Sequence, residues 1–276
     1  MTLQKGAKVK IRNSEMACFT GRIATVDHSA PDKDNTTVYR LRIGDMVLPG
    51  WYGIDDLEPL YRPYTTLIID FEGTLSDTSE GVIKSMANAL EQFNIQFDEQ
   101  EDLSYLVGLD PAECFCHYFM MKPAEVTTAT QLFNDHYASI GIYGQKIHPG
   151  MLELLDKLRK EGFSLVAFSM KPVEDLRFSL EYLEVADYFD TVYGIEILQK
   201  GFDETQLLDS LLRSRAVGGD RSEFVFIGDS ADDMRAAAAN GIDSIGVLWG
   251  FGEESVLAKA GAKHLARDQK ELAGFL

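Results

Sequence analysis

Apolar and polar residues alternate in short segments over residues 1–62. The run AKVKIR alternates apolar with basic residues, GRIATV follows a glycine, and VYRLRI places three apolar side chains on one face of a strand and Arg40 and Arg42 on the other. Closely spaced short strands of this kind are typical of small all-β units. The pattern therefore predicts a small β-barrel over residues 1–62.

From residue 64 onward the period changes, and strand-like runs alternate with helical ones. The strand-like runs are TTLIID, FSLVAFS, EFVFIGD and SIGVLWG, and the helical runs include GMLELLDKLRKEG and DETQLLDSLLRS, with leucines three and four residues apart. This alternation predicts an α/β fold with a parallel sheet covered by helices on both faces. We assign residues 64–79 and 146–276 to this fold.

The alternation is interrupted between residues 80 and 145. The interval contains helical patterns such as EGVIKSMANALEQF and ATQLFNDHYASIG, and no strand-like run. We interpret it as a helical cap inserted after the first strand of the sheet.

The end of the predicted barrel, GWYGIDDLEPL, resembles that of SH3-like barrels. Trp51 and Tyr52 have two possible roles. They contact a protein partner of a binding or regulatory module, or they fill the barrel or dock it on the next domain. Pro59 and Pro63 bracket a short linker after it.

Composition narrows the functional classes. Apolar residues make up 45% and charged residues 25% of the chain, which is ordinary for a globular protein. The net charge is −18, of which residues 1–62 carry +1 and the remainder −19, and this argues against nucleic acid as a partner. Without a long apolar run or a signal-peptide pattern, we expect a cytoplasmic protein with no membrane partner.

The run CFCH lacks the second ligand pair of a metal site, which favours helix packing for Cys114 and Cys116.

Acidic, hydroxyl and basic residues follow the ends of the predicted strands. Asp70 ends LIID, Ser169 ends LVAFS, and Asp229 ends FVFIGD and is followed by Asp233. Lys200 lies in the loop before DETQLLDSLL. Because ligands of open parallel sheets bind outside the carboxyl ends of the strands, we expect these side chains to meet at one edge. Crowded carboxylates require a cation, and an all-oxygen site suits Mg²⁺.

Two further groups of residues have open interpretations. Asp77 and Glu80 fit a capping box at a helix start, and Ser230 fits the first position of the helix ADDMRAAAA. Lys171 is either a second cation for an anionic ligand or a solvated residue at a helix start.

In order and spacing, DFEGTLSDT, FSMK, Lys200 and GDSADD resemble the four motifs of the haloacid dehalogenase (HAD) superfamily. The runs HPGMLELLDKLRKEG and GVLWGFG further resemble its phosphoglycolate-phosphatase-like subgroup. This resemblance covers residues 64–276. It implies a Rossmann-like core, a cap after the first motif, and Mg²⁺-dependent hydrolysis of a small phosphorylated metabolite.

The resemblance also implies a role for each motif residue. Asp70 would be the nucleophile that forms an aspartyl-phosphate, and Ser169 and Lys200 would bind and neutralise the phosphoryl group. Asp229 would bind Mg²⁺ together with Asp70, helped by Asp233 and by the backbone carbonyl of Glu72. The phosphate-binding set implied by the motifs is Gly73, Thr74, Ser169, Met170 and Lys200.

The first motif departs from the family pattern at Glu72. Hydrolytic relatives have an aspartate there, which protonates the leaving oxygen and then activates water. The ordinary pKa values of the two acids are close, about 4.3 and 3.9, but one extra methylene moves the carboxylate by roughly 1 Å, and such a misplacement costs about a hundredfold in rate. The metal contact of this residue uses the backbone, so the change concerns proton transfer.

Three hypotheses about function follow. The first is a phosphatase whose loop has adapted to Glu72 or which turns over slowly. The second is a related enzyme with other chemistry, such as a mutase or a phosphonate or haloacid hydrolase, and the retained carboxylate argues against it. The third is a binding or regulatory protein with weak or no turnover, and the presence of Asp70, Ser169, Lys200 and Asp229 weakens it. We predict the first.

Overall fold

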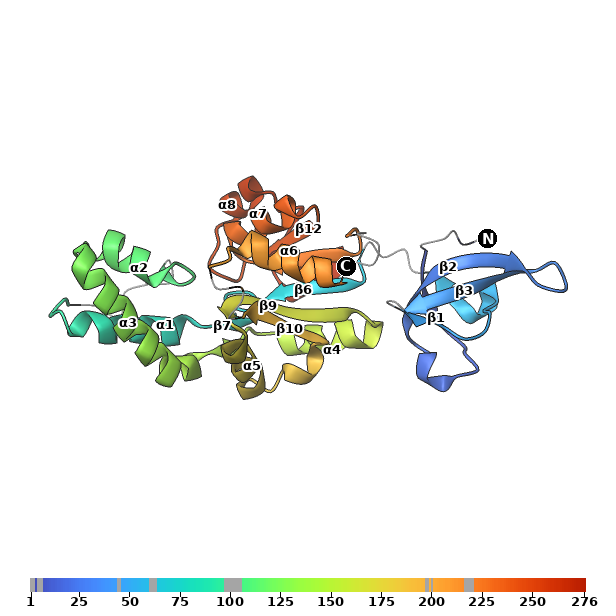
Figure 1. Cartoon of the computed structure of the whole chain (residues 1–276), viewed down its shortest axis with the longest axis horizontal. Helices are drawn as coiled ribbons and strands as arrows, with labels where there is room; N and C mark the ends of the chain where they lie inside the picture. The colour runs from blue at the N-terminus through green and yellow to red at the C-terminus, as the bar shows by residue number, and fades with distance from the viewer. Residues whose placement is uncertain are drawn as a thin grey trace.

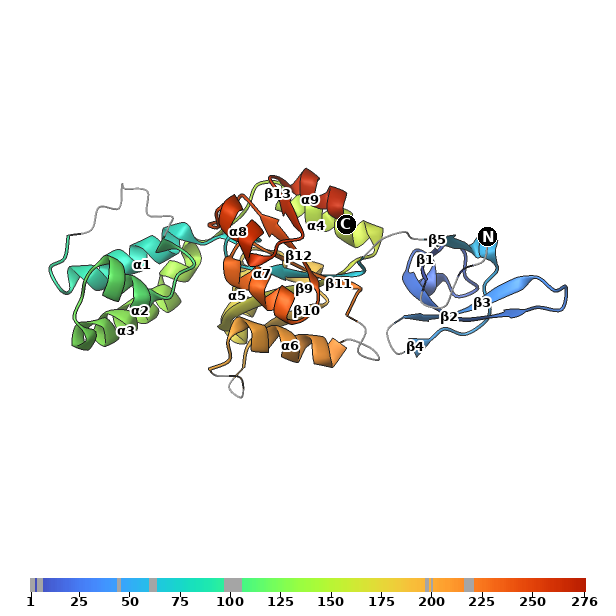
Figure 2. The same cartoon turned by 90° about the horizontal axis from the view of Figure 1, so that it is seen from above.

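The computed structural model describes residues 3, 7–43, 46–59, 64–96, 106–196, 199, 201–215 and 221–276. A parallel sheet flanked by helices occupies the middle of the molecule, with an antiparallel N-terminal sheet at one end and a helical segment at the other (Figures 1 and 2). Each part has its own cluster of buried apolar side chains.

Six parallel strands form the central sheet, in the order β10-β9-β6-β11-β12-β13. Their bounds are β6 (Thr66–Asp70), β9 (Ser164–Pro172), β10 (Thr191–Ile195), β11 (Phe224–Gly228), β12 (Asp243–Val247) and β13 (His264–Ala266). The predicted parallel sheet is confirmed. The sequence pattern missed β10 and β13, the two edge strands, because most of their residues are only half-buried and form no continuous apolar run.

Helices cover both faces of this sheet, as predicted (Figure 1). One face packs against α4 (Met151–Glu161), α5 (Val173–Tyr182) and α9 (Gln269–Phe275), and the other against α6 (Glu204–Arg215) and α7 (Ala231–Ala239). The helix α8 (Glu254–Ala260) packs beside α7. Leucines at three- and four-residue spacing in α4 and α6 supply the buried stripes, which are the source of the helical periodicity in the sequence.

The N-terminal sheet is antiparallel, in the order β4-β3-β2-β1-β5. Its strands are β1 (Lys8–Ile11), β2 (Ile23–Pro31), β3 (Thr37–Ile43), β4 (Met46–Val47) and β5 (Leu57–Pro59). Tyr39 and Leu41 are buried on the predicted inner face, and Tyr52 is buried while Trp51 is 47% exposed. The short strands are confirmed, and the SH3-like assignment stays a prediction. Pro63 of the predicted linker lies outside the described residues.

The helical segment contains α1 (Ser79–Glu91), α2 (Pro111–Glu113) and α3 (Pro123–Ser139), with a π-helical turn over Cys114–Tyr118 between α2 and α3. In the described part of residues 80–145 there is no strand, as expected. Cys114 is buried in the apolar cluster of this segment, which confirms its packing role.

Two short antiparallel strands connect the helical segment to the rest of the chain. They are β7 (Ser76–Asp77) before it and β8 (Lys146–Ile147) after it. Asp77 accepts a hydrogen bond from the Ser79 N–H at 2.9 Å, so it does cap α1. The predicted capping box is wrong, however, because the Glu80 carboxylate binds Lys84 and Lys146 at 2.8 and 2.7 Å. Hydrogen bonds from these two lysines lower the pKa of Glu80 to about 2.

A membrane-crossing helix would need a longer apolar stretch than any helix among the described residues provides.

Candidate active site

Three aspartates meet at the carboxyl ends of two neighbouring strands. Asp70 is the last residue of β6, and Asp229 directly follows β11, which pairs with β6. Asp233 lies one helical turn further on, in α7. One carboxylate oxygen from each of the three lies within 4.8 Å of the other two. The structure therefore brings together the acids that the sequence placed at one edge.

Asp229 is 3% exposed and is held by hydrogen bonds from two other loops. Its Oδ1 accepts a 3.0 Å bond from Thr74 Oγ1, and its Oδ2 accepts a 2.7 Å bond from the Phe251 N–H. Thr74 is anchored in turn, because its carbonyl accepts a 3.0 Å bond from Trp249 Nε1. These contacts fix the rotamer of the carboxylate.

Glycines pack directly against the Asp229 side chain. A Cβ at Gly73 would lie 2.3 Å from Asp229 Oδ2, and one at Gly250 would lie 2.4 Å from Asp229 Cβ. Gly73 also has φ +76°, which favours glycine. These positions show why the loops carry glycine: the backbone approaches the carboxylate too closely for any other residue.

Asp233 is fixed by the start of α7. Its N–H donates a 3.0 Å bond to Ser230 Oγ, and its Oδ2 accepts a 2.7 Å bond from the Ser230 N–H. This reciprocal pair is the capping interaction expected for Ser230. Asp233 thus contributes both to the helix start and to the aspartate cluster.

Burial and mutual repulsion disfavour the charged forms of these acids. Burial, followed by the charges of Asp233, Asp229 and Glu72, raises the pKa of Asp70 well above its usual range. Burial and the Asp233 charge raise the pKa of Asp229 to about 7. A cation between these carboxylates would remove both penalties. The donor set is all oxygen and small, which fits Mg²⁺ with water and substrate oxygens completing its shell.

Glu72 and Lys171 form an ion pair beside the cluster. The Lys171 ammonium lies 3.3 Å from Glu72 Oε1, with the lysine side chain 10% exposed and the glutamate side chain 32% exposed. The backbone of Glu72 also forms an isolated β-bridge with the backbone of Ser76 in the tight turn after β6. The interpretation of Lys171 as a solvated helix start is wrong, since β9 continues to Pro172 and the side chain turns inward.

Ser169 and Met170 lie in β9, next to β6. Phe168 pairs in register with Asp70, so Ser169 follows directly at the edge where the aspartates meet. Ser169 is 2% exposed, and its Oγ accepts a 3.2 Å bond from the Lys171 N–H, whereas Met170 is 40% exposed. Lys200 lies outside the described residues.

Glu204, the first residue of α6, is a nearby acid that the sequence reasoning missed. Burial, the charge of Asp233 and a hydrogen bond with the Asp233 side chain raise the pKa of Glu204 to about 12. An acidic residue in the first helical turn is ordinary, so nothing in the local sequence distinguishes it.

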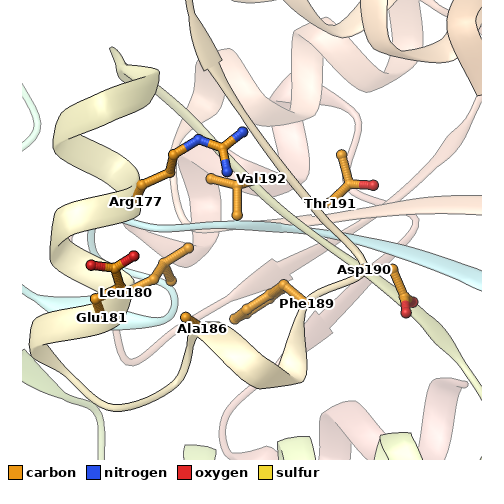
Figure 3. A pocket seen from close by; sticks show the side chains of 8 residues that line it. All are labelled: Arg177, Leu180, Glu181, Ala186, Phe189, Asp190, Thr191 and Val192. Atoms are coloured by element: carbon orange, nitrogen blue, oxygen red, sulfur yellow. The ribbon is translucent and has the colours of Figure 1, made fainter.

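A surface hollow of about 370 Å³ lies elsewhere, between α5 and the start of the edge strand β10 (Figure 3). Its lining side chains include Arg177, Phe189 and Thr191. The hollow lies at the start of β10, whereas the aspartates lie at the carboxyl ends of β6 and β11, so it is not part of the aspartate site.

Comparisons with known proteins agree with this geometry. A family model described as haloacid dehalogenase-like hydrolase matches residues 67–247, which leaves the N-terminal sheet outside the match. The chain is 27% identical over 213 residues to a 5'-nucleotidase of Pseudomonas aeruginosa, covering 77% of this chain and 96% of that protein. It is 31% identical over 211 residues to a phosphoglycolate phosphatase of Salmonella typhi, covering 68% and 83%. The crystal structure of a predicted phosphatase from Clostridium acetobutylicum has a TM-score of 0.68 and 29% identity, covering 76% of this chain and 97% of that one.

Proposed function

The chain belongs to the haloacid dehalogenase-like hydrolase family, and on that basis we propose that it is a Mg²⁺-dependent phosphomonoesterase that hydrolyses a small phosphorylated metabolite. The observation that carries this proposal is the cluster of Asp70, Asp229 and Asp233 at the carboxyl edge of the sheet. Three crowded carboxylates are unfavourable without a cation, and a cation there would face whatever anion Asp70 attacks.

In this proposal Asp70 is the nucleophile. Its carboxylate attacks the phosphorus atom, the bond to the leaving oxygen breaks, and Glu72 gives its proton to that oxygen. Glu72 then takes a proton from water, the water oxygen bonds to phosphorus, and the bond to Asp70 breaks. Phosphate leaves, Asp70 is again an ionised carboxylate, and Glu72 again carries the proton that it can give to the next leaving oxygen.

The remaining groups bind and orient the phosphoryl group. Ser169 lies beside Asp70 in the sheet and would donate from its hydroxyl. The Gly73 N–H is used within the turn, where it donates a 2.8 Å bond to the Ser76 carbonyl, so the phosphate-binding role expected for this turn falls to the Thr74 N–H. Lys200 and Met170 complete the set expected from the motifs.

Asp70, Asp229 and Asp233 would hold Mg²⁺, together with the Glu72 carbonyl. When bound, the ion neutralises negative charge on the phosphoryl oxygens. The residues themselves orient the site, since Thr74 and the Phe251 N–H fix Asp229 before any ion arrives. A preset rotamer reduces the entropy lost on binding.

The helical segment 80–145 acts as a cap over this edge. A Cβ at Gly108 would lie 3.9 Å from the Phe251 ring, and that ring packs against the apolar cluster of the segment. The Phe251 N–H bonds Asp229, and this link between the segment and the aspartate cluster supports a cap role. We infer that it excludes water and selects the leaving group.

A screen of phosphorylated metabolites with and without Mg²⁺ tests the function. Wild type is expected to release phosphate only with Mg²⁺, and Asp70→Asn is expected to release none. Hydrolysis that survives Asp70→Asn would remove the nucleophile assignment. Wild type inert to every substrate, with Glu72→Asp active, would favour the binding or regulatory alternative.

A further inference from the structure

The Lys171 ammonium contacts groups from two parts of the molecule. On the core side, Nζ lies 3.3 Å from Glu72 Oε1 and 5.9 Å from the centre of the Phe71 ring. On the cap side, Nζ donates a 2.6 Å hydrogen bond to Tyr137 OH and lies 4.4 Å from the centre of the Tyr137 ring. A buried ammonium is unfavourable unless it is paired, so its location depends on both partners.

The sheet fixes the backbone of Lys171. Its N–H donates a hydrogen bond to Ser169 Oγ. Its carbonyl oxygen packs closely against Gly194 of β10, since a Cβ added to that glycine would lie only 2.7 Å from this oxygen. The register between β9 and β10 shifts at that point, which brings Ile195 opposite Pro172. The side chain therefore starts from a rigid position in the core.

The cap fixes Tyr137. This residue lies in α3, and its ring stacks on Phe133 at 5.8 Å between ring centres and 14° between ring planes. Phe133 is buried in the cap's apolar cluster. Burial lowers the pKa of Lys171, but Glu72 and Tyr137 outweigh it and hold the pKa above its usual range. The group is thus an ammonium that donates to both partners.

We propose that Lys171 and Tyr137 are positioning residues for Glu72, and that the contact from Tyr137 makes this positioning depend on the seating of the cap on the core. The inference rests on the proposed function. A glutamate at position 72 reaches Lys171, whereas an aspartate is shorter by one methylene, roughly 1 Å. The ion pair therefore explains how this chain can use a glutamate at position 72, because Lys171 holds the Glu72 carboxylate in one position.

The two chemical steps depend differently on Glu72 when the leaving group is a good one. With 4-nitrophenyl phosphate the leaving phenolate needs no proton, so transfer to Asp70 proceeds with Glu72 in the ionised form that pairs with Lys171. Hydrolysis of the aspartyl-phosphate still needs Glu72 to take a proton from water. Misplacing Glu72 should therefore trap the phosphoenzyme, which a role of Lys171 in substrate binding would not do.

The experiment compares wild type, Lys171→Met, Tyr137→Phe and the double variant on 4-nitrophenyl phosphate with Mg²⁺. We expect kcat to fall at least about tenfold for Lys171→Met and about threefold for Tyr137→Phe, with KM falling in parallel so that kcat/KM stays within about twofold, because only the second step slows. Acid quenching should recover more protein-bound phosphate from both variants than from wild type. The double variant should be no slower than Lys171→Met, because Tyr137 acts through Lys171.

Matched controls and conservative variants separate positioning from folding. Lys84→Met removes an exposed ion pair with Glu80, and Tyr182→Phe removes an exposed hydroxyl, and neither should change kcat. Tyr137→Phe keeps the ring that stacks on Phe133 and removes only the hydroxyl. If Lys171→Met melts below the assay temperature, the phosphoenzyme level of Tyr137→Phe therefore tests the inference. In a Glu72→Asp background, Lys171→Met should cost less than in wild type.

The possible failures are distinguishable. A rise in KM without trapped phosphoenzyme would show that Lys171 binds substrate and would overturn the inference. Additive losses in the double variant would show that Tyr137 acts independently and would also overturn it. Active wild type with unaffected variants would overturn this inference alone, whereas wild type that hydrolyses no phosphate ester would overturn the proposed function.

Discussion

Thr74 Oγ1 donates a 3.0 Å hydrogen bond to Asp229 Oδ1, joining the turn after β6 to the end of β11 across 155 residues of sequence. Both residues are almost completely buried. The Thr74 hydroxyl holds the buried Asp229 carboxylate in one rotamer. Groups that hydrogen-bond the ligands of a metal site orient those ligands in the same way.

Thr74→Val removes this bond and keeps the volume of the side chain. We expect the Mg²⁺ concentration for half-maximal activity to rise by about tenfold to a hundredfold, because Asp229 loses its orientation. The control is Thr78→Val. Thr78 is equally buried, but its Oγ1 has no hydrogen-bond partner among the described residues, so this variant should keep wild-type Mg²⁺ dependence. Equal effects of the two variants would contradict the role of the bond.

Gly73→Ala places a methyl group where Asp229 already stands. The new Cβ would lie 2.3 Å from Asp229 Oδ2, and the residue would keep φ +76°. We expect kcat/KM to fall by at least about a hundredfold, because the cluster must open by more than 1 Å. Gly274→Ala is the matched control, since nothing lies within 4 Å of its Cβ. Steady-state kinetics of the two purified variants, with melting curves for each, would check this.

The stability of the Mg²⁺-free protein should fall as pH rises from about 5 to about 8. A carboxyl group with a raised pKa stabilises the folded state fully below its ordinary pKa, and this contribution is lost as pH rises through the folded value, about 7 for Asp229. The ion-paired acids with lowered pKa values, such as Glu80, are already ionised across this range. Melting in the presence of a chelator should show a decrease in Tm on the order of 5 °C.

Two further measurements make that prediction specific to the cluster. Mg²⁺ added at about pH 8 should restore most of the lost Tm, because it binds the ionised carboxylates of the folded state only. Asp229→Asn should flatten the pH dependence in chelator. A Tm that increases over the same pH range would show that burial of these acids is not costly.

Removal of residues 1–62 should leave catalysis unchanged. The N-terminal sheet has its own apolar cluster and lies at the end of the molecule opposite the cap (Figure 1). Its contact with the core includes Ile23 against Gly162, at the end of α4 and away from the aspartates. We expect kcat/KM within about twofold of the full chain. A larger loss in a truncated protein that melts normally would indicate that this sheet regulates the site.

The aspartate cluster could be predicted from the sequence because its members follow strands with strong local signals. Leu67, Ile68 and Ile69 are buried on both sides of the sheet, so they form a continuous apolar run that ends at Asp70. Asp229 ends a similar run. Parallel strands with known ends bring these residues to one edge without further information.

The pairing of Lys171 could not be predicted. The local sequence SMKP suggests a helix start, and the partner Tyr137 lies 34 residues away in a different part of the fold. Glu204 was missed for a related reason, since only tertiary packing brings the start of α6 against Asp233. Long-range burial of charge leaves no periodic pattern in a sequence.

The two strands that connect the cap, β7 and β8, also bear on how such a protein can change during evolution. Asp77 pairs directly with Lys146, so the helical segment leaves and rejoins the sheet domain at neighbouring residues. A segment attached in this way can be lengthened, shortened or exchanged with little loop-closure cost and without altering the register of the parallel strands. The helical segment is therefore separable from the strands that hold Asp70 and Asp229, but a donor segment exchanged for residues 80–145 would also have to supply the contact that Tyr137 makes with Lys171.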